Sequence, residues 1–467
     1  MSVLIPSDRI GHIEGFGQSS GADGYVYRPT NLEQIQDCFE LARKAGRKVV
    51  LRGAGRSYGD ASILNEGVVL DITRMRQILS WDPRTGVIEA QAGATIEDIW
   101  RLTLEDGWWP PVVSGTMFPT LAGALAMNIH GKNNPQAGTI GEHVEEIDVL
   151  FPNGELRTLT NQDRLFYAVI SGFGSLGAIV RVKLRMKKIQ NGNLQVLPLR
   201  CANWDEQFAA FEKYVPIADY QVSWVDCFAR GKGFGRGDFH AAWYAYDGQE
   251  HPLSLNANSQ DLPDTILGFF PKSSVWRYLR WFNNRTGMRM INAAKHRSGF
   301  ISEGRPFQQS LVAFSFLLDF VPDWRKSYLP GGFIQYQSFV PKERAPEVFA
   351  HQVELQQAAG LESFLGVLKR HRPDKFLLSH AVDGYSLALD FKITAGNKQR
   401  VFALAHKMND LVLEAGGRFY LAKDSTLRPS DVEAYLGQDT LAEYRKLKSE
   451  LDPGMLLTSS LAQRLDF

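Results

Sequence analysis

The stretch that decides the fold is Arg52-Gly53-Ala54-Gly55-Arg56-Ser57-Tyr58-Gly59-Asp60. It follows the apolar run Lys-Val-Val-Leu-Arg at 48–52, which predicts a short buried strand. Glycines in such a loop let backbone N–H groups approach an anion closely. The loop is not a P-loop, because the Gly-Lys-Ser/Thr ending of that motif is absent. It predicts either a cradle for an anionic ligand or a Gly-rich surface turn.

A second small-residue segment lies further along the chain. It contains Ser114-Gly115-Thr116, then Thr120-Leu121-Ala122-Gly123-Ala124, and ends at Asn128-Ile129-His130-Gly131-Lys132-Asn133. Small side chains there would let the chain wrap a long ligand that carries a pyrophosphate. Two such segments, each after a strand, favour a nucleotide over two surface turns.

A third glycine motif matches a dinucleotide fingerprint in its letters but not in its surroundings. Residues 172–177, Gly-Phe-Gly-Ser-Leu-Gly, match the dinucleotide fingerprint G-x-G-x-x-G. That fingerprint needs a strand before it, a helix after it and an acid about 20 residues on. Here a helix at 164–170 precedes the motif, a strand at 178–186 follows it, and the acid is missing. We interpret it as a tight helix-to-strand turn.

The remaining patterns indicate an α+β chain with at least two domains. Helices are expected at 31–46, from Thr95 with a capping box at Asp98, at 398–415, from Arg428-Pro429 and at the C-terminus. Strands are expected at 68–72, 86–93, 311–320, 332–340, 362–369, 385–393 and 418–422. Residues 144–159 predict a hairpin with a type I′ turn at Asn153-Gly154.

Composition excludes several classes of protein. The 467 residues are 44% hydrophobic and 22% charged, with a net charge of +1, which argues against disorder and against a wholly basic nucleic-acid binder. Three scattered cysteines are too few for a disulfide framework or a Cys-based metal site, so no metal is expected. No signal peptide or membrane-spanning stretch is visible, so we expect a cytoplasmic protein, with peripheral membrane contact left open.

The order of these motifs resembles the FAD-binding domain of the vanillyl-alcohol oxidase / p-cresol methylhydroxylase (PCMH) superfamily. Within it, the chain is most similar to the decaprenylphosphoryl-β-D-ribose 2′-oxidase family. The blocks that carry this closer resemblance are His-Gly-Lys-Asn at 130–133, Gln-Tyr-Gln at 335–337, Leu-Lys-Arg at 368–370, Tyr-Leu-Ala-Lys-Asp-Ser at 420–425 and Ala-Gln-Arg-Leu at 462–465.

The resemblance implies a two-subdomain PCMH-type FAD domain with an inserted antiparallel-sheet substrate domain. The expected limits are 1–195 for the FAD domain, 196–411 for the substrate domain, and 412–467 for the part that completes the FAD domain. The implied FAD contacts are Gly53, Ala54, Gly55, Arg56, Ser57, Tyr58, Gly59, Asp60, Ala61, Gly115, Thr120, Leu121, Ala122, Gly123, Asn128, Ile129, His130, Ile179 and Tyr420. Many superfamily members carry a flavin-linked histidine where Tyr58 stands, so we expect non-covalent FAD.

The same resemblance implies active-site positions at Tyr58, His130, Gln335, Gln337, Lys369, Tyr385 and Lys423. The family's active-site cysteine falls on Ala388, which predicts insensitivity to thiol-trapping inhibitors and weakens the substrate assignment. Alternatives stay open for each role. Lys423 either stabilises developing negative charge or forms a salt bridge with Asp424, and His130 either carries a proton or only packs.

The two glutamines and Lys369 have open roles too. Gln335 and Gln337 are two apart on a strand, so they face the same side. They bind sugar hydroxyls or lie on an exposed sheet face. Lys369 pairs with a substrate phosphate or belongs to a basic loop with Arg370 and His371.

Residues 265–302 form a basic aromatic segment. It holds seven Lys and Arg and no Asp or Glu, so it carries +7 while the rest of the chain carries −6. Val275, Leu279 and Phe282 are expected on one helical face. Such a helix is typical of an interfacial membrane binder, and the alternative is a solvated helix that packs on the acidic remainder.

These patterns lead to one leading hypothesis and two rivals. The first is FAD-dependent oxidation of the 2′-hydroxyl of a lipid-linked sugar phosphate, a polyprenylphosphoryl ribose, with an NAD(P)H-dependent keto-reductase as partner in a 2′-epimerase. The rivals are an aldonolactone or alditol oxidase and a catalytically silent flavin-binding subunit. Oxygen and a quinone both stay open as the electron acceptor.

Overall fold

The first part of the chain forms two sheets. The computed structural model describes residues 4–246, 248, 252–266 and 268–467. One sheet has the order β1-β2-β4-β3 and the other β5-β6-β10-β8-β9. Their strands are β1 (Ile10–Glu14), β2 (Gly21–Tyr27), β3 (Val49–Arg52), β4 (Val68–Asp71), β5 (Ile78–Asp82), β6 (Val87–Gln91), β8 (Val144–Leu150), β9 (Leu156–Thr160) and β10 (Ala178–Arg185).

Local signals set the helices of this part. Asn31 caps α1 (Leu32–Lys44), and Thr95 and Asp98 form the expected capping box on α2 (Ile96–Thr103). The others are α3 (Leu121–Ala126), α4 (Asn134–Ala137) and α5 (Arg164–Val169). The Gly-Phe-Gly-Ser-Leu-Gly motif lies between α5 and β10, so the expected helix-to-strand turn is confirmed.

The hairpin between β8 and β9 is confirmed, but its predicted turn type is wrong. A type I′ turn needs positive φ at both central residues. Gly154 has φ +89°, whereas Asn153 is not among the residues with positive φ. The Gly154 N–H donates to Phe151 O, which places Pro152 and Asn153 at the centre of the turn. Pro152 suits the first central position of a type I turn, and Gly154 then takes the left-handed position that follows it.

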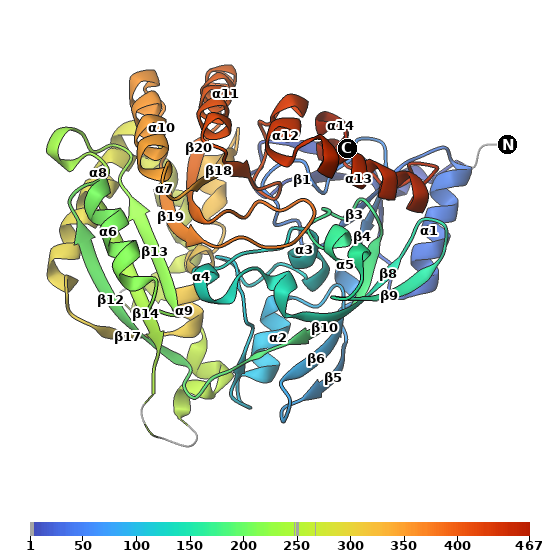
Figure 1. Cartoon of the computed structure of the whole chain (residues 1–467), viewed down its shortest axis with the longest axis horizontal. Coiled ribbons are helices and arrows are strands. Elements are labelled where there is room, and N and C mark those ends of the chain that lie inside the picture. Colours follow the sequence, from blue (N-terminus) through green and yellow to red (C-terminus); the bar gives the residue numbers. More distant parts are fainter. Residues whose placement is uncertain (1–3, 247, 249–251, 267) are drawn as a thin grey trace.

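The second part is built on one large antiparallel sheet, β17-β12-β14-β13-β19-β20-β18-β21. Its strands are β12 (Asn193–Cys201), β13 (Tyr220–Val225), β14 (Gly237–Tyr244), β17 (Phe307–Ser310), β18 (Phe333–Pro341), β19 (Gly366–His371), β20 (Gly384–Lys392) and β21 (Arg418–Phe419). One face is covered by α6 (Trp204–Tyr214), α10 (Ala345–Ala359) and α11 (Lys398–Glu414) (Figure 1). The α+β fold with an antiparallel substrate sheet is confirmed.

One predicted strand is a helix, and two others have different limits. The strand expected at 362–369 is β19 (Gly366–His371), and the one expected at 418–422 is β21 (Arg418–Phe419). Residues 311–320 form α9 (Leu311–Ser315) and a 3-10 turn, because Ser310 accepts a hydrogen bond from Ala313 N and caps a helix. Eight of its ten residues are apolar, and such a short run does not distinguish a strand from a buried helix. The strand expected at 418–422 ends at Phe419, since the backbone turns where Lys423 N donates to Tyr420 O.

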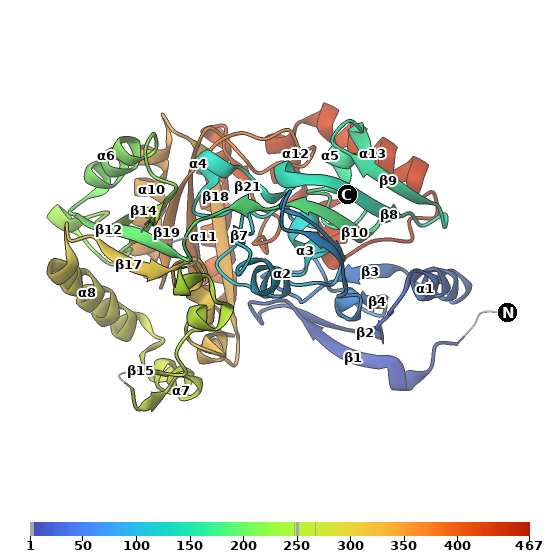
Figure 2. The same ribbon diagram turned by 90° about the horizontal axis from the view of Figure 1, so that it is seen from below.

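The last residues return to the first part of the chain. Helices α12 (Pro429–Leu436), α13 (Gln438–Leu451) and α14 (Ser460–Leu465) lie there, and Val49 of β3 exchanges backbone hydrogen bonds with Leu456 and Thr458. Two further helices, α7 (Lys272–Phe282) and α8 (Arg285–Ser302), lie at the other end (Figure 2). The domain limits at 195 and 411 stay a prediction.

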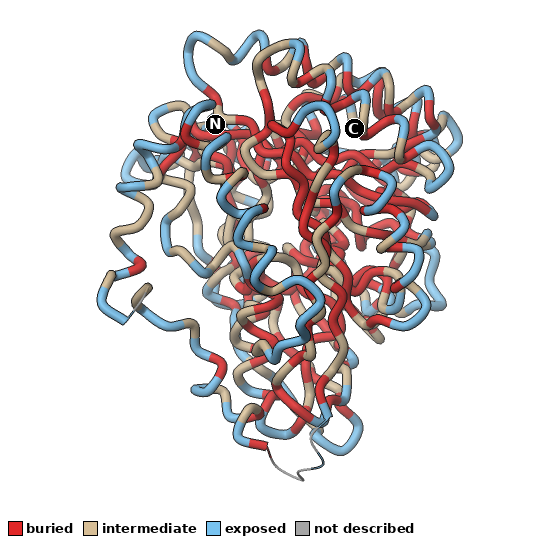
Figure 3. Tube along the Cα trace, turned by 90° about the vertical axis from the view of Figure 1, so that its left-hand side faces the viewer, coloured by how far each residue is buried: buried red, intermediate tan, exposed pale blue. Residues whose placement is uncertain are grey.

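Short elements complete the described chain. The strands are β7 (Trp108–Trp109), β11 (Lys187–Lys188), β15 (Thr265–Ile266) and β16 (Phe270–Pro271). The 3-10 helices are η1 (Ser7–Arg9), η2 (Ile72–Arg74), η3 (Ile140–His143), η4 (Gly231–Gly233), η5 (Leu253–Leu255), η6 (Ala257–Gln260), η7 (Leu317–Asp319) and η8 (Trp324–Tyr328). Buried residues run along the interior strands, and the outer helices alternate buried with exposed positions (Figure 3).

Candidate active site

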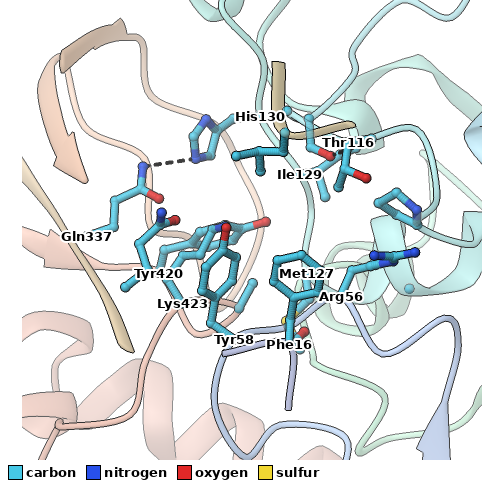
Figure 4. A pocket seen from close by; sticks show the side chains of 18 of the residues that line it. Phe16, Arg56, Tyr58, Thr116, Met127, Ile129, His130, Gln337, Tyr420 and Lys423 are labelled. Atoms are coloured by element: carbon cyan, nitrogen blue, oxygen red, sulfur yellow. Dashed lines mark hydrogen bonds between the residues drawn. The ribbon is translucent and has the colours of Figure 1, made fainter. Parts of the chain in front are cut away.

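A cavity of about 470 Å³ lies where the Gly-rich loops of the first part meet the open face of the large sheet. Loop residues 52–58 and 114–116 and the start of α3 form one wall, and strands β13, β18, β19 and β20 form another. Tyr420 and Lys423 reach it from the segment after β21 (Figure 4). Three segments far apart in sequence therefore converge on one site.

The loop after β3 offers a row of free backbone donors. Within the described chain, the N–H groups of residues 53–57 donate no hydrogen bond. Gly55 has φ +63°, and a Cβ on Gly53 would lie 2.2 Å from Thr120 Oγ1, so both glycines are required by the local geometry. A run of unpaired amides at the wall of a cavity matches an anionic, phosphate-bearing group.

The structure brings most of the expected FAD contacts to this cavity. Those that line it are Gly53, Ala54, Gly55, Arg56, Ser57, Tyr58, Ala61, Gly115, Thr120, Ala122, Gly123, Ile129, His130, Ile179 and Tyr420.

Four expected contacts lie just behind the cavity wall. Asp60 pairs with Arg464 at 2.8 Å, and the Asn128 side chain accepts from Gly141 N. Leu121 is fully buried, and Gly59 packs so closely that a Cβ there would lie 2.0 Å from Asp424 O. These residues support the loops rather than face the cavity.

Lys423 is a half-buried cation in the cavity wall. Its Nζ lies 3.6 Å from the centre of the Tyr58 ring. The salt bridge considered for Lys423 is not formed, because Asp424 pairs with Arg464 at 2.7 Å. Burial lowers the pKa of Lys423 to about 7, and the nearby carboxylate of Asp390 opposes that shift. The Asp390 carboxylate therefore helps to keep Lys423 in its charged form.

Asp390 is a functional candidate that the sequence reasoning missed. It is buried on β20 and accepts a hydrogen bond from Gln335 Nε2 at 2.6 Å, and its second oxygen has no partner among the described residues. Burial raises its pKa to about 7. The available signal was its position two residues after Ala388, which places both on the same face of the strand.

A buried hydrogen-bonded network joins His130 to the sheet. The Gln337 side-chain nitrogen lies 3.2 Å from His130 Nε2 and donates to Ser386 Oγ at 3.2 Å. Ser386 Oγ is also 2.8 Å from His371 Nε2. Burial, assisted by the positive charge of Lys369, holds the pKa of His130 well below its usual range, so its imidazole is neutral.

Lys369 and Lys132 give the cavity two further amines. Both residues line it as half-buried side chains, and the Lys132 amine donates to Phe314 O. Burial lowers the pKa of Lys369 to about 8, and burial together with Lys369 lowers the pKa of Lys132 to about 7. Sequence reasoning did not place Lys132 in the site, although it stands two residues after His130. Two amines in one cavity favour an anionic ligand, because its charge would stabilise both ammonium forms.

Tyr385 is the one expected active-site residue that the structure turns away. Its hydroxyl bonds to Glu212 of α6, on the helix-covered face of the sheet. Successive strand residues alternate sides, so its neighbour Ser386 takes the cavity-side position, as does Ala388. The prediction that Tyr385 lies in the active site is therefore wrong: Ser386, which accepts a hydrogen bond from Gln337, is on that side of the strand instead.

The cavity fits a flavin dinucleotide on its own features. The unpaired amides suit its pyrophosphate, and the small side chains at Gly115, Ala122 and Gly123 leave room for a flat group. The Tyr58 Oη and His130 Nδ1 atoms are buried without a partner among the described residues. Buried polar atoms of that kind normally have partners, which a bound molecule can supply.

Comparison with known proteins agrees with this geometry. The family model described as FAD binding domain matches residues 24–160. The chain is 31% identical to the decaprenylphosphoryl-β-D-ribose oxidase of Mycolicibacterium smegmatis over 97% of this chain and 96% of that protein. It is also 27% identical to the L-gulono-1,4-lactone dehydrogenase of Mycobacterium tuberculosis over 36% of this chain and 39% of that protein. A putative D-arabinono-1,4-lactone oxidase of Neurospora crassa is 28% identical over 34% of this chain and 28% of that protein.

Proposed function

Because the chain belongs to the same family of FAD-dependent oxidoreductases as decaprenylphosphoryl-β-D-ribose oxidase, we propose that it oxidises the 2′-hydroxyl of a polyprenylphosphoryl-β-D-ribose to a 2′-keto sugar. The observation that carries this proposal is the pair of half-buried amines, Lys132 and Lys369, in the same cavity as two glutamines; the Lys369 amine has no hydrogen-bond partner among the described residues. The amines suit a phosphate and the glutamines suit sugar hydroxyls. A soluble polyol or aldonolactone would leave the amines without an anion.

The oxidation removes a hydride from the carbinol carbon and a proton from its oxygen. Bound FAD supplies the two-electron acceptor. Lys423 stabilises negative charge as it develops on the sugar oxygen. We propose that the hydroxyl proton goes to His130 Nε2, which exchanges its contact with the Gln337 amide for the sugar hydroxyl.

The remaining residues orient the sugar and keep water out. Gln335 and Gln337 are buried on the cavity side of β18, and Asp390 fixes the Gln335 amide. Tyr58 closes the wall under Lys423. Tyr58 cannot form the histidyl–flavin bond of many superfamily members, so we propose that FAD is held without a covalent link.

The proposed product defines the partner enzyme. A 2′-keto sugar must be reduced from the opposite face to complete an epimerisation, and an NAD(P)H-dependent keto-reductase would do so. The pair would supply an arabinose donor for envelope glycans.

Product analysis tests the proposal. The FAD-loaded enzyme is given polyprenylphosphoryl-β-D-ribose and an artificial electron acceptor, and the lipid product is examined by mass spectrometry. We expect a loss of two hydrogens, located at C2′ by borodeuteride trapping. Turnover with aldonolactones or alditols but not with the phosphoribosyl lipid would instead establish the rival activity.

A further inference from the structure

The end of the molecule that carries α7 presents exposed aromatic side chains. We call this the α7 surface, and it consists of Phe269, Arg277, Tyr278, Arg280, Trp281 and Phe282. Trp281 is 82% exposed and Phe269 is 74% exposed. Figure 2 shows α7 and β15 projecting beyond the body of the protein. Among the described residues, no helix has the length and apolar character to cross a bilayer.

The other face of α7 packs on the protein, and the side chains of the α7 surface point away from it. The helix packs on η8. Lys272 Nζ lies 3.5 Å from the centre of the Phe320 ring, and Lys326 of η8 lies over Trp276. The sequence placed Val275, Leu279 and Phe282 on the interfacial face. The structure instead leaves Val275 and Leu279 half-buried and turns Tyr278 and Trp281 outward.

The charges on these two helices are largely unneutralised. Arg285 pairs with Glu362 at 2.6 Å, and Lys295 lies 3.5 Å from Asp238. Four other arginines have no carboxylate within 4.0 Å in the described part of the chain, namely Arg277, Arg280, Arg289 and Arg297. A surface that combines free arginines with aromatic rings complements an anionic lipid headgroup layer.

The α7 surface is close to an exposed residue of the active-site cavity. Leu317 lines the cavity and is 55% exposed, and Phe320, in the same short segment, contacts Lys272 of α7. A molecule that reaches the cavity past Leu317 therefore passes close to α7.

We propose that the α7 surface docks the protein on an anionic lipid bilayer, with the rings at headgroup depth and the arginines on lipid phosphates. The inference rests on the proposed function, since a substrate with a polyprenyl tail resides in a bilayer. Docking would hold the cavity beside the membrane, so the sugar headgroup could enter while its tail stays in lipid.

Vesicle sedimentation with the full-length FAD-loaded protein tests the inference. The probes are phosphatidylcholine vesicles with and without phosphatidylglycerol. We expect binding to the mixed vesicles that weakens with added salt. The Arg277→Gln/Arg280→Gln protein should bind about 30-fold more weakly, at about 1 kcal/mol per cation and a factor of ten per 1.4 kcal/mol.

Matched variants separate the surface from general effects. Tyr278→Ser/Trp281→Ser should also lose vesicle binding, whereas Tyr246→Ser, which removes an exposed ring elsewhere, should not. All variants should keep turnover on a short-chain substrate dissolved in detergent, which shows that they fold.

The outcomes separate the docking surface from the proposed function. The inference would be overturned if wild-type protein does not bind anionic vesicles, or if the α7 variants bind them as strongly as wild type. Either result would count even if the short-chain phosphoribosyl lipid is oxidised. A surface buried in a stable complex with a second copy or another protein, and unable to bind vesicles, would overturn it too. Vesicle binding that depends on α7, without oxidation of that substrate, would support docking and contradict the proposed function.

Discussion

Replacing Lys369 by Met tests the phosphate site in the cavity. The substitution keeps most of the side-chain volume but removes one of the two amines, Lys369 and Lys132, that line the cavity. We expect weaker binding of the phosphoribosyl lipid with little change for an uncharged ribosyl analogue. FAD should be retained, because Lys369 is not among the expected flavin contacts.

The expected loss of affinity follows from the loss of one hydrogen bond to a charged phosphate. A hydrogen bond to a charged group contributes about 1.5–3 kcal/mol, so the affinity should fall by a factor of roughly 10 to 150. Lys369 also lowers the pKa of Lys132, so its removal should raise the pKa of Lys132 above about 7. Lys132 would then be more fully protonated at neutral pH and would retain part of the phosphate binding.

The assay is a titration of the flavin absorbance with each ligand under conditions that block turnover. Lys375→Met is the matched control, because Lys375 is exposed and does not line the cavity. Equal losses for the phosphorylated and the uncharged ligand would refute the reasoning, since Lys369 would then shape the cavity without recognising phosphate.

Three further predictions concern the chemistry and the buried charges. Lys423→Ala should keep FAD but lower kcat by a factor of about 10²–10³, which is the usual cost of removing one group that stabilises developing charge. Stopped-flow measurement of flavin reduction checks this, and full turnover would contradict it. Asp390→Asn should lower the pKa of Lys423 further, because the Asp390 carboxylate raises that pKa. The alkaline limb of the pH profile of kcat/KM should therefore move to lower pH. A limb that does not move would exclude this coupling between the two residues. Burial lowers the pKa of His380 to about 3, so the unfolded chain binds a proton below about pH 6.5 that the folded chain does not. Stability should therefore fall with decreasing pH, by about 1.4 kcal/mol per unit for each such group, and His380→Gln should flatten the dependence of urea denaturation on pH; an unchanged slope would contradict this.

Local signals predicted the loops and caps of this fold well. The Gly-rich loop after β3 and the capping box of α2 are set by residues close together in the sequence, and both form as expected. The strand prediction at 311–320 was wrong because eight of its ten residues are apolar, so neither the period of a strand nor that of a helix is visible in it. Its Ser310 cap was the discriminating signal.

The candidate site was only partly predictable because its other residues meet through sheet register. The resemblance located β20, but a shift of one residue exchanges the two faces, which is why Tyr385 was expected where Ser386 lies. His130 and Gln337 are 207 residues apart in sequence, and only the packed sheet shows that they touch. Asp390 and His371 join the site for the same reason, since their partners lie on neighbouring strands.

The central claim is that this flavoenzyme takes its hydride from a lipid-linked sugar phosphate. An anaerobic absorbance titration of the oxidised, FAD-loaded protein tests it most directly, because it needs no knowledge of the electron acceptor. The account predicts stoichiometric bleaching of the flavin band by polyprenylphosphoryl-β-D-ribose and none by L-gulono-1,4-lactone or free ribose. Bleaching by the lactone with no response to the phosphoribosyl lipid would contradict it.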